Sequence, residues 1–155
     1  MKRTSLQDQP CAIAKSLDII GDWWTLLIIR DALVGLRRFG EFQRSLGAAK
    51  NILAARLKAL VAEGILITAP ASDGSAYQEY VLTEKGRALV PVLVALSQWS
   101  SEYAFAPGAH AFVPLDVDSL QPLAKLQLRT PAGRVLNNDE VKFPAGVIAR
   151  SDPAS

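Results

Sequence analysis

Hydrophobic side chains recur at helical spacing through the first part of the chain, and single glycines interrupt the pattern. From Ala12 the apolar positions repeat every three or four residues until Gly21. Asp22 is a suitable N-cap for the next segment, which is apolar almost all round and is therefore expected at the centre of the core. The pattern predicts four helices, at residues 12–20, 23–34, 39–46 and 50–62.

A β-hairpin is predicted directly after the fourth helix. Residues 65–69 and 77–82 have β character, and the stretch between them, 70–75, is rich in turn-forming residues. The third and fourth helices are joined by the short glycine-containing turn 47–49, which is typical of a helix-turn-helix unit. A hairpin that follows such a unit takes the position of a wing.

The chain changes in composition after residue 106. Before this point, Thr83 is a suitable N-cap for a fifth helix to about Phe105, in which Pro91 should produce a kink or an irregular first turn. Six of the nine prolines lie beyond residue 106, and no helical spacing of hydrophobic residues continues there. We expect a small hairpin and one further short strand instead, at residues 123–129, 134–136 and 141–143.

Charge is unevenly distributed along the chain. Residues 1–60 contain ten Lys/Arg and five Asp/Glu, a net charge of +5, whereas residues 61–155 contain seven and ten, a net charge of −3. A basic half joined to an acidic half is typical of a protein with a nucleic-acid surface on one side. Chance variation on solvated faces explains the same numbers, so the motifs have to decide.

The fourth predicted helix has the pattern of a helix that enters the DNA major groove. Its leucines fall on one face, and the opposite face is narrow, with small residues and a few donors near its N-terminus. Lys50 and Asn51 are the candidates for base contacts, and Lys58 for a phosphate or guanine. The alternative is that Asn51 caps the helix and Lys58 is merely solvated. Small residues of the same outward face complete the predicted DNA-binding set on this helix, namely Ala54 and Ala55.

Residues before and after this helix should bind the DNA backbone. The predicted phosphate contacts around the third helix are Arg37, Arg38, Gln43 and Arg44, and those of the wing tip are Ser72, Gly74 and Ser75. The wing tip has no Lys or Arg, and Asp73 would oppose DNA there, so wing contacts should be weak. Arg56 lies beside the apolar stripe and is expected to be an internal brace, paired with an acid such as Glu41 or Asp31, rather than a base reader.

These motifs, in this order and spacing over nearly ninety residues, resemble the HxlR family of bacterial winged-helix regulators. The matching pieces are LDIIGDWWTLLIIRD (17–31), GLRRFGEFQ (35–43), ILAARLKAL (52–60), GIL (64–66), YVLTEKG (80–86), LVPVL (89–93) and Trp99. The resemblance implies a homodimer on double-stranded DNA that represses or activates nearby genes. It implies a dimer built mainly from the fifth helix and the N-terminal helix, and the candidate interface residues on or next to the fifth helix are Leu89, Val92, Leu93, Leu96, Trp99 and Tyr103.

The resemblance also draws attention to the single cysteine, Cys11, because some family members use an N-terminal cysteine to sense oxidants or electrophiles. A helix N-terminus and Lys15 one turn away would help its thiol react, whereas a free cysteine is also often a small buried hydrophobic residue. Ala12 stands where a proline often follows this cysteine in the family. Both interpretations stay open.

We therefore expect an α+β, mainly α protein: a winged helix-turn-helix domain with a C-terminal dimerisation helix at 1–105, a small β appendage at 106–150 and a disordered tail at 151–155. With His110 as its only histidine and no cysteine, the appendage should bind no zinc, and no cofactor is expected. No catalytic constellation, signal peptide or membrane span is evident, so a cytoplasmic regulator is favoured over an enzyme.

Two points stay open in this interpretation. An interaction module that kept the fold but lost DNA binding is the alternative function. The sequence also leaves open a small-molecule or oxidant effector, for which the dimer seam near Trp23, Trp24, Trp99 and Tyr103 is the candidate place.

Overall fold

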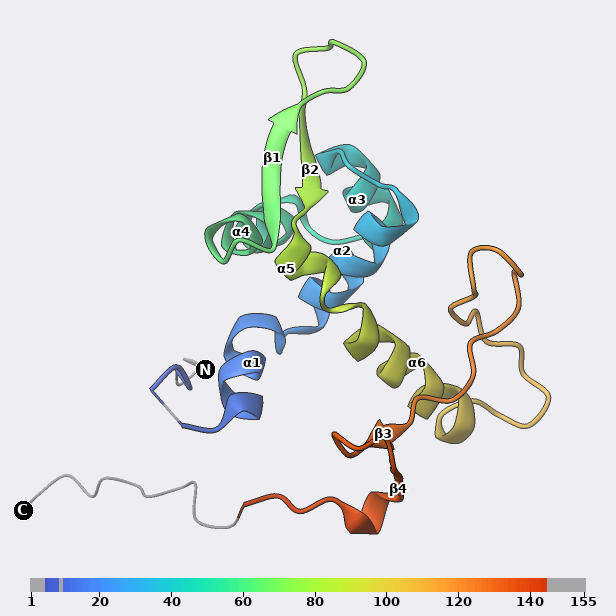
Figure 1. Ribbon diagram of the computed structural model, residues 1–155. Helices are drawn as coiled ribbons and strands as arrows, with labels where there is room; N and C mark the ends of the chain where they lie inside the picture. Colours follow the sequence, from blue (N-terminus) through green and yellow to red (C-terminus); the bar gives the residue numbers. More distant parts are fainter. Residues whose placement is uncertain (1–4, 9, 145–155) are drawn as a thin grey trace, which may run out of the picture. The chain divides into compact units, whose positions relative to one another are not determined.

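The computed structural model describes residues 5–8 and 10–144. Its first half contains four helices with the bounds that the hydrophobic pattern predicts (Figure 1). They are α1 (Ala12–Ile20), α2 (Trp23–Val34), α3 (Phe39–Leu46) and α4 (Lys50–Ala62). These bounds could be predicted because local signals set them, as the ends of α2 and α3 illustrate.

Asp22 caps α2, as expected, by accepting a hydrogen bond from the Thr25 backbone N–H at 3.0 Å. The start of α3 is capped from inside the helix instead. The carboxylate of Glu41 accepts the backbone N–H groups of Arg37 at 2.8 Å and Arg38 at 2.9 Å. At the other end of α3, Gly47 has a φ of +62°, a left-handed conformation that glycine adopts without strain, and so the chain can turn sharply into α4.

The core of this region lies among α2, α3, α4 and the start of the hairpin. Phe42 is fully buried and meets the ring of Tyr80 edge to face, with 6.5 Å between the ring centroids. The other fully buried aliphatic side chains are Ile28, Ile29, Leu53, Leu57, Leu60, Ile65 and Leu66. The expectation that α2 is central is therefore confirmed for its middle, at Ile28 and Ile29, whereas Trp23 at its start and Val34 at its end are 78% and 75% exposed.

The hairpin after α4 is an antiparallel pair of strands, β1 (Leu66–Pro70) and β2 (Gln78–Leu82), within one residue of the prediction at each end. Its register pairs Leu66 with Leu82 at one end and Pro70 with Gln78 at the other. The loop between the strands projects beyond the helices as a wing, at the top of Figure 1.

The predicted fifth helix is two helices, α5 (Glu84–Arg87) and α6 (Val90–Tyr103), and its continuous form was wrong. Thr83 caps α5, as expected, by accepting from the Gly86 N–H at 3.1 Å. Pro91 explains the break, because it has no N–H to continue the helical ladder and its ring clashes with the preceding turn. The sequence located the irregularity, but the structure makes it an interruption rather than a kink.

By its internal contacts the chain divides into two units, Met1–Leu89 and Val90–Ser155. The division after residue 105 that the sequence suggested stays a prediction. Within the second unit, the predicted hairpin is confirmed but short, with β3 (Leu128–Arg129) paired to β4 (Val135–Leu136).

The end of the chain departs from the prediction in one respect. A 3-10 turn, η1 (Asn138–Glu140), follows β4, and residues 141–143 form no strand, contrary to the prediction, because they have no partner edge among the described residues. The predicted end of the appendage and the tail, residues 145–155, lie outside the described residues.

Candidate nucleic-acid interface

The helix α4 presents one buried and one exposed face, as its sequence predicts. Leu53, Leu57 and Leu60 are at most 2% exposed and anchor the helix on the core. The exposed side chains of the opposite face are Asn51, Ala54, Ala55 and Lys58. Small residues over the middle of this face allow a close approach of the helix to another surface, as major-groove reading requires.

The N-terminus of α4 is free of side-chain caps. Its N-cap residue, Ala49, has no side chain that can accept, and the first helical hydrogen bond runs from Leu53 N–H to Ala49 O at 3.0 Å. Asn51 lies inside the first turn and does not cap the helix, so the alternative that assigned it that role is wrong. The uncapped amides of this turn are suited to an anion such as a phosphate.

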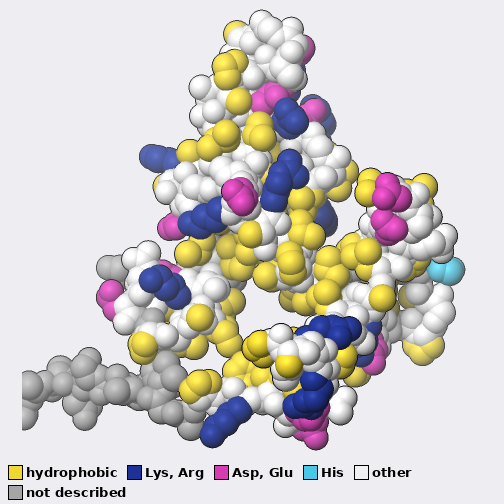
Figure 2. Space-filling view, viewed as in Figure 1, with side chains coloured by type: hydrophobic (Ala, Val, Ile, Leu, Met, Phe, Trp, Pro, Cys, Tyr) yellow, Lys and Arg dark blue, Asp and Glu magenta, His cyan; other side chains and the backbone are white. Residues whose placement is uncertain are grey.

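Three of the predicted basic contacts are unpaired, and two are not. Within the described residues, Arg44, Lys50 and Lys58 are exposed and form no ion pair. Arg37 and Arg38 lie in the loop before α3, and each pairs with an acid of the wing hairpin. Near the wing, Figure 2 accordingly shows basic and acidic side chains next to one another.

The acid that pairs with Arg37 is Glu79, which sequence reasoning missed. Its side chain is buried, and one carboxylate oxygen accepts the backbone N–H and the hydroxyl of Ser72, at 3.1 and 2.9 Å. Its other oxygen lies 3.4 Å from Arg37 Nη1. The Ser72 N–H, the Ser72 hydroxyl and the Arg37 guanidinium hold the pKa of Glu79 below its ordinary value. The available signal was an acidic residue within the predicted second strand, directly before Tyr80, Val81 and Leu82.

Arg38 pairs with Asp73 at the tip of the wing, and its guanidinium stacks over the ring of Tyr77 at 5.5 Å from the ring centroid. Hydrogen bonds from the backbone and hydroxyl of Ser75, together with Arg38, lower the pKa of Asp73. The hydrogen bond to Asp73 in turn raises the pKa of Arg38. Arg38, Arg44 and Tyr77 line an open groove between α3 and β2.

Arg56 is a brace, as expected, but not with the partners that the sequence suggested. Its Nε lies 3.6 Å from the cap residue Asp22, which ties α4 to the start of α2. Glu41 is engaged by the backbone before α3, and Asp31 pairs with its neighbour Arg30 at 2.8 Å. The predictions of Glu41 and Asp31 as partners were therefore wrong, because Glu41 accepts backbone N–H groups before α3 and Asp31 uses its Oδ1 for Arg30, while the Oδ2 of Asp31 is buried without a hydrogen-bond partner among the described residues.

A family model described as HxlR-like helix-turn-helix matches residues 19–106, more than half of the chain. The chain belongs to the HxlR-like helix-turn-helix family. This membership and the observed hairpin confirm the mainly helical winged helix-turn-helix fold.

Individual relatives of this HxlR-like chain bear the names of transcriptional regulators. The uncharacterized HTH-type transcriptional regulator Rv3095 of Mycobacterium tuberculosis is 42% identical over 96 residues, which are 62% of this chain and 61% of the relative, so the chain spans less than two thirds of that protein. The crystal structure of PA1607, a candidate transcription factor, is 50% identical with a TM-score of 0.84 and covers 92% of this chain and 99% of PA1607. Transcriptional regulators are normally not enzymes.

A third relative has been solved in more than one chemical state. The reduced form of the transcriptional regulator YodB from Bacillus subtilis is 30% identical, with a TM-score of 0.54, over 64% of this chain and 98% of YodB. YodB has also been solved after treatment with diamide, a thiol oxidant. In the present HxlR-like chain, Cys11 is the residue before α1 and is half-buried.

The second unit of this HxlR-like protein contains the predicted dimer helix. On α6, Val92, Leu96, Trp99 and Tyr103 are exposed and recur at spacings that place them on one side of the helix. Trp99 and Tyr103 lie in ring contact, 6.1 Å between centroids. Of the remaining predicted interface residues, Leu93 is half-buried on α6, and Leu89 lies one residue before α6 and is also half-buried.

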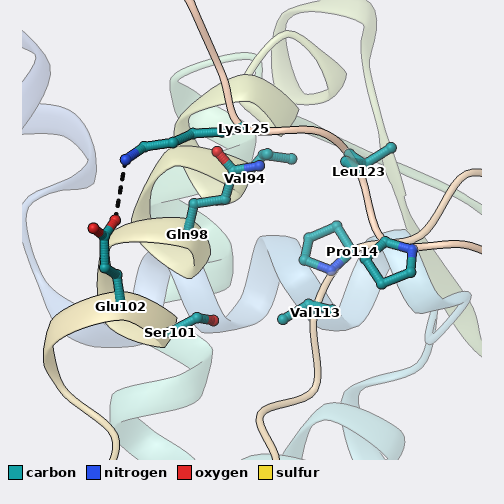
Figure 3. Close-up of a pocket in the computed structure, with 9 residues that line it drawn as sticks. Val94, Gln98, Ser101, Glu102, Val113, Pro114, Leu123 and Lys125 are labelled. Atoms are coloured by element: carbon teal, nitrogen blue, oxygen red, sulfur yellow. Dashed lines mark hydrogen bonds and ion pairs between the residues drawn. The ribbon is translucent and has the colours of Figure 1, made fainter.

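The other side of α6 lines a small pocket with the chain that follows it (Figure 3). Val94 and Gln98 of α6 face Pro114 and Leu123 across a space of about 320 Å³, which Lys125 borders through an ion pair to Glu102 at 3.1 Å. Gln98 fixes the facing segment, because its amide donates to Ala124 O at 3.0 Å and accepts from Leu126 N–H at 2.8 Å.

Neither a metal site nor a membrane helix is seen in the part of the chain that the structure describes. No three His, Cys, Asp or Glu residues among those described are grouped so that they could hold a metal ion. None of the described helices has the length and apolar character needed to cross a bilayer.

Proposed function

We propose that this chain is a DNA-binding transcriptional regulator that acts as a homodimer, with α4 reading the major groove of an inverted-repeat operator. The observation that carries this proposal is the exposed face of α4, which combines an uncapped N-terminus, unpaired cations and alanines. In a dimer, the two α4 helices would enter successive major grooves about 34–36 Å apart on one side of the duplex.

Within this proposal the side chains divide into two kinds of contact. Asn51 and Lys50 lie on the first turn of α4 and are proposed to contact base edges. Lys58 and Arg44 are proposed to bind phosphates, with Gln43 as an additional donor. The hydroxyls of Ser72 and Ser75 are already hydrogen-bonded, to Glu79 of β2 and to Arg38 in the loop before α3, which supports the expectation that wing contacts are weak.

The proposal of a homodimer rests on the exposed apolar stripe of α6. Large apolar side chains exposed at helical spacing normally mark an interface. The apolar residues Ile13 and Leu17 of α1 are also exposed, in agreement with the role that the family resemblance implies for the N-terminal helix.

The experiment that tests DNA binding is fluorescence anisotropy with duplex from upstream of the protein's own gene and a scrambled duplex, each titrated with salt. Wild type should bind the first duplex selectively and lose affinity steeply as salt rises, through counterion release. Asn51→Ala should lower this selectivity by about 1–3 kcal/mol. Arg44→Ala should weaken both duplexes alike and reduce the slope of log K against log salt by about 0.9.

Lys142→Ala is the matched control, because it removes one exposed positive charge from the second unit. Identical behaviour of the Asn51 and Arg44 variants would contradict the division into base and phosphate contacts. A folded wild-type dimer that binds neither duplex would favour the protein-interaction module.

A response to thiol oxidants at Cys11 is a further part of the proposal. The support comes from YodB, a relative that has been solved in reduced and diamide-treated forms, and from the partial exposure of the Cys11 side chain. Cys11→Ser should leave basal DNA binding unchanged and abolish any effect of diamide on it. A diamide effect that persists in this variant would assign the response elsewhere.

A further inference from the structure

The wing tip carries a carboxylate that faces back towards the helix-turn-helix unit. Asp73 lies in the loop between β1 and β2, where its Oδ1 accepts the Ser75 N–H at 3.0 Å and Gly74 N–H bonds to Ala71 O at 3.1 Å. Its Oδ2 accepts from Arg38 Nη2, and the same nitrogen lies 3.5 Å from the Ser75 hydroxyl oxygen. The wing tip thus presents a fixed anion to the arginine that precedes α3.

The two ion pairs between the hairpin and the arginines before α3 differ in how readily another anion can replace the carboxylate. The Glu79 carboxylate is about 6% exposed and also bonds to Ser72, so its pair with Arg37 is internal to the fold. The Asp73 side chain is 55% exposed, and Arg38 approaches it from the surface. An exposed ion pair contributes little to stability, and its carboxylate competes with other anions in solution for the guanidinium group.

Carboxylate and phosphate bind a guanidinium group with the same forked geometry. We propose that Asp73 is an internal phosphate mimic, which occupies Arg38 in the free protein and must be exchanged for a DNA phosphate on binding. This proposal rests on the proposed function, since it assumes that the loop before α3 approaches a duplex. It assigns to Arg38 a phosphate contact that is blocked at rest and to Asp73 the role of its competitor.

The exchange has a consequence that does not depend on DNA sequence. The need to displace Asp73 lowers the affinity for every duplex by the same factor. The freed carboxylate takes up a counterion, and this uptake partly offsets the counterions that the DNA phosphates release on binding. Non-specific binding is thereby kept weak, while the base contacts of α4 still discriminate between sequences. The operator is therefore not needed to test the proposal.

The test is a double-mutant cycle with wild type, Asp73→Asn, Arg38→Gln and the double variant, each in the full chain. Asparagine keeps the oxygen that accepts the Ser75 N–H and removes only the charge. Asp73→Asn should bind a scrambled duplex roughly two- to fivefold more tightly at 0.15 M salt, with a steeper salt dependence by up to about one unit of slope. In the Arg38→Gln background the same substitution should change the affinity less than about 1.5-fold.

Asp118→Asn, which removes one exposed charge from the second unit, should leave affinity unchanged. Unchanged affinity in Asp73→Asn, with wild type binding normally, would overturn the exchange and leave the proposed function intact. An equal gain in the Arg38→Gln background would also overturn it, because Asp73 would then act by general repulsion. Wild type that binds no duplex at all would contradict the proposed function and the exchange together.

Discussion

Gly86 is the position where the smallest substitution should have a large effect on stability. It is buried in the short helix α5, and a Cβ added there would lie 2.4 Å from the Ile65 carbonyl oxygen and 2.8 Å from Leu82 Cδ2. The leucine methyl can rotate away. The carbonyl oxygen cannot, because it accepts the Thr83 N–H at 3.1 Å and the Thr83 hydroxyl at 3.1 Å.

The magnitude follows from three effects. Inserting a methyl group into a packed site costs about 1–3 kcal/mol. Moving α5 away to relieve the clash weakens the two Thr83 bonds, each contributing about 1 kcal/mol. Replacing glycine by alanine in a helix recovers up to about 1 kcal/mol. Gly86→Ala should therefore lower the free energy of unfolding by about 2 kcal/mol.

Gly40→Ala is the matched control, because its Cβ would meet only Arg44 Nη1 at 3.8 Å within α3. It should be neutral or raise stability by up to about 1 kcal/mol. Urea unfolding followed by circular dichroism measures both variants, at one protomer concentration because association contributes to apparent stability. The reasoning would be refuted if Gly86→Ala unfolded at the same urea concentration as Gly40→Ala, or at a higher one.

Three further predictions concern other parts of the chain. Asp22→Ala should lower stability by about 1–2 kcal/mol, because Asp22 caps α2 and pairs with Arg56, whereas Asp22→Asn should retain most of the cap; equal losses in urea unfolding would contradict this. The Arg37 and Arg38 backbone N–H groups lower the pKa of Glu41, so its stabilisation is complete above its ordinary pKa of 4.5 and is lost as pH falls through its folded value. The stability difference between wild type and Glu41→Gln should therefore be constant from pH 7 to about 5 and shrink below 4.5, and a difference that grows in acid would refute it. Leu96→Asp should shift sedimentation from dimer to monomer while Ser101→Asp, on the opposite side of α6, should not, and dimers in both would exclude this stripe as the interface.

The sequence predicted well what is encoded locally. The bounds of α1 to α4 follow from hydrophobic spacing and from single cap and turn residues such as Asp22 and Gly47, so no knowledge of distant residues was needed. The same holds for the exposed face of α4. The break at Pro91 was located, but its extent depends on how α5 packs on Ile65, which no local pattern contains.

The failures are contacts between residues distant in sequence. Asp73 and Arg38 are 35 residues apart, and the register of the hairpin brings them together. Arg56 was correctly predicted to need an acid, but the choice of Asp22 depends on the crossing of α4 and α2.

The alanine face of α4 has a consequence for engineering. The packing of this helix depends on Leu53, Leu57 and Leu60, while its exposed positions include Ala54, Ala55 and Ala59. A longer side chain at an exposed alanine gains a functional group without displacing anything in the fold. Libraries of Gln, Arg or Ser at these positions would therefore vary base preference on a constant scaffold, which makes the helix a starting point for regulators retargeted to chosen DNA sequences.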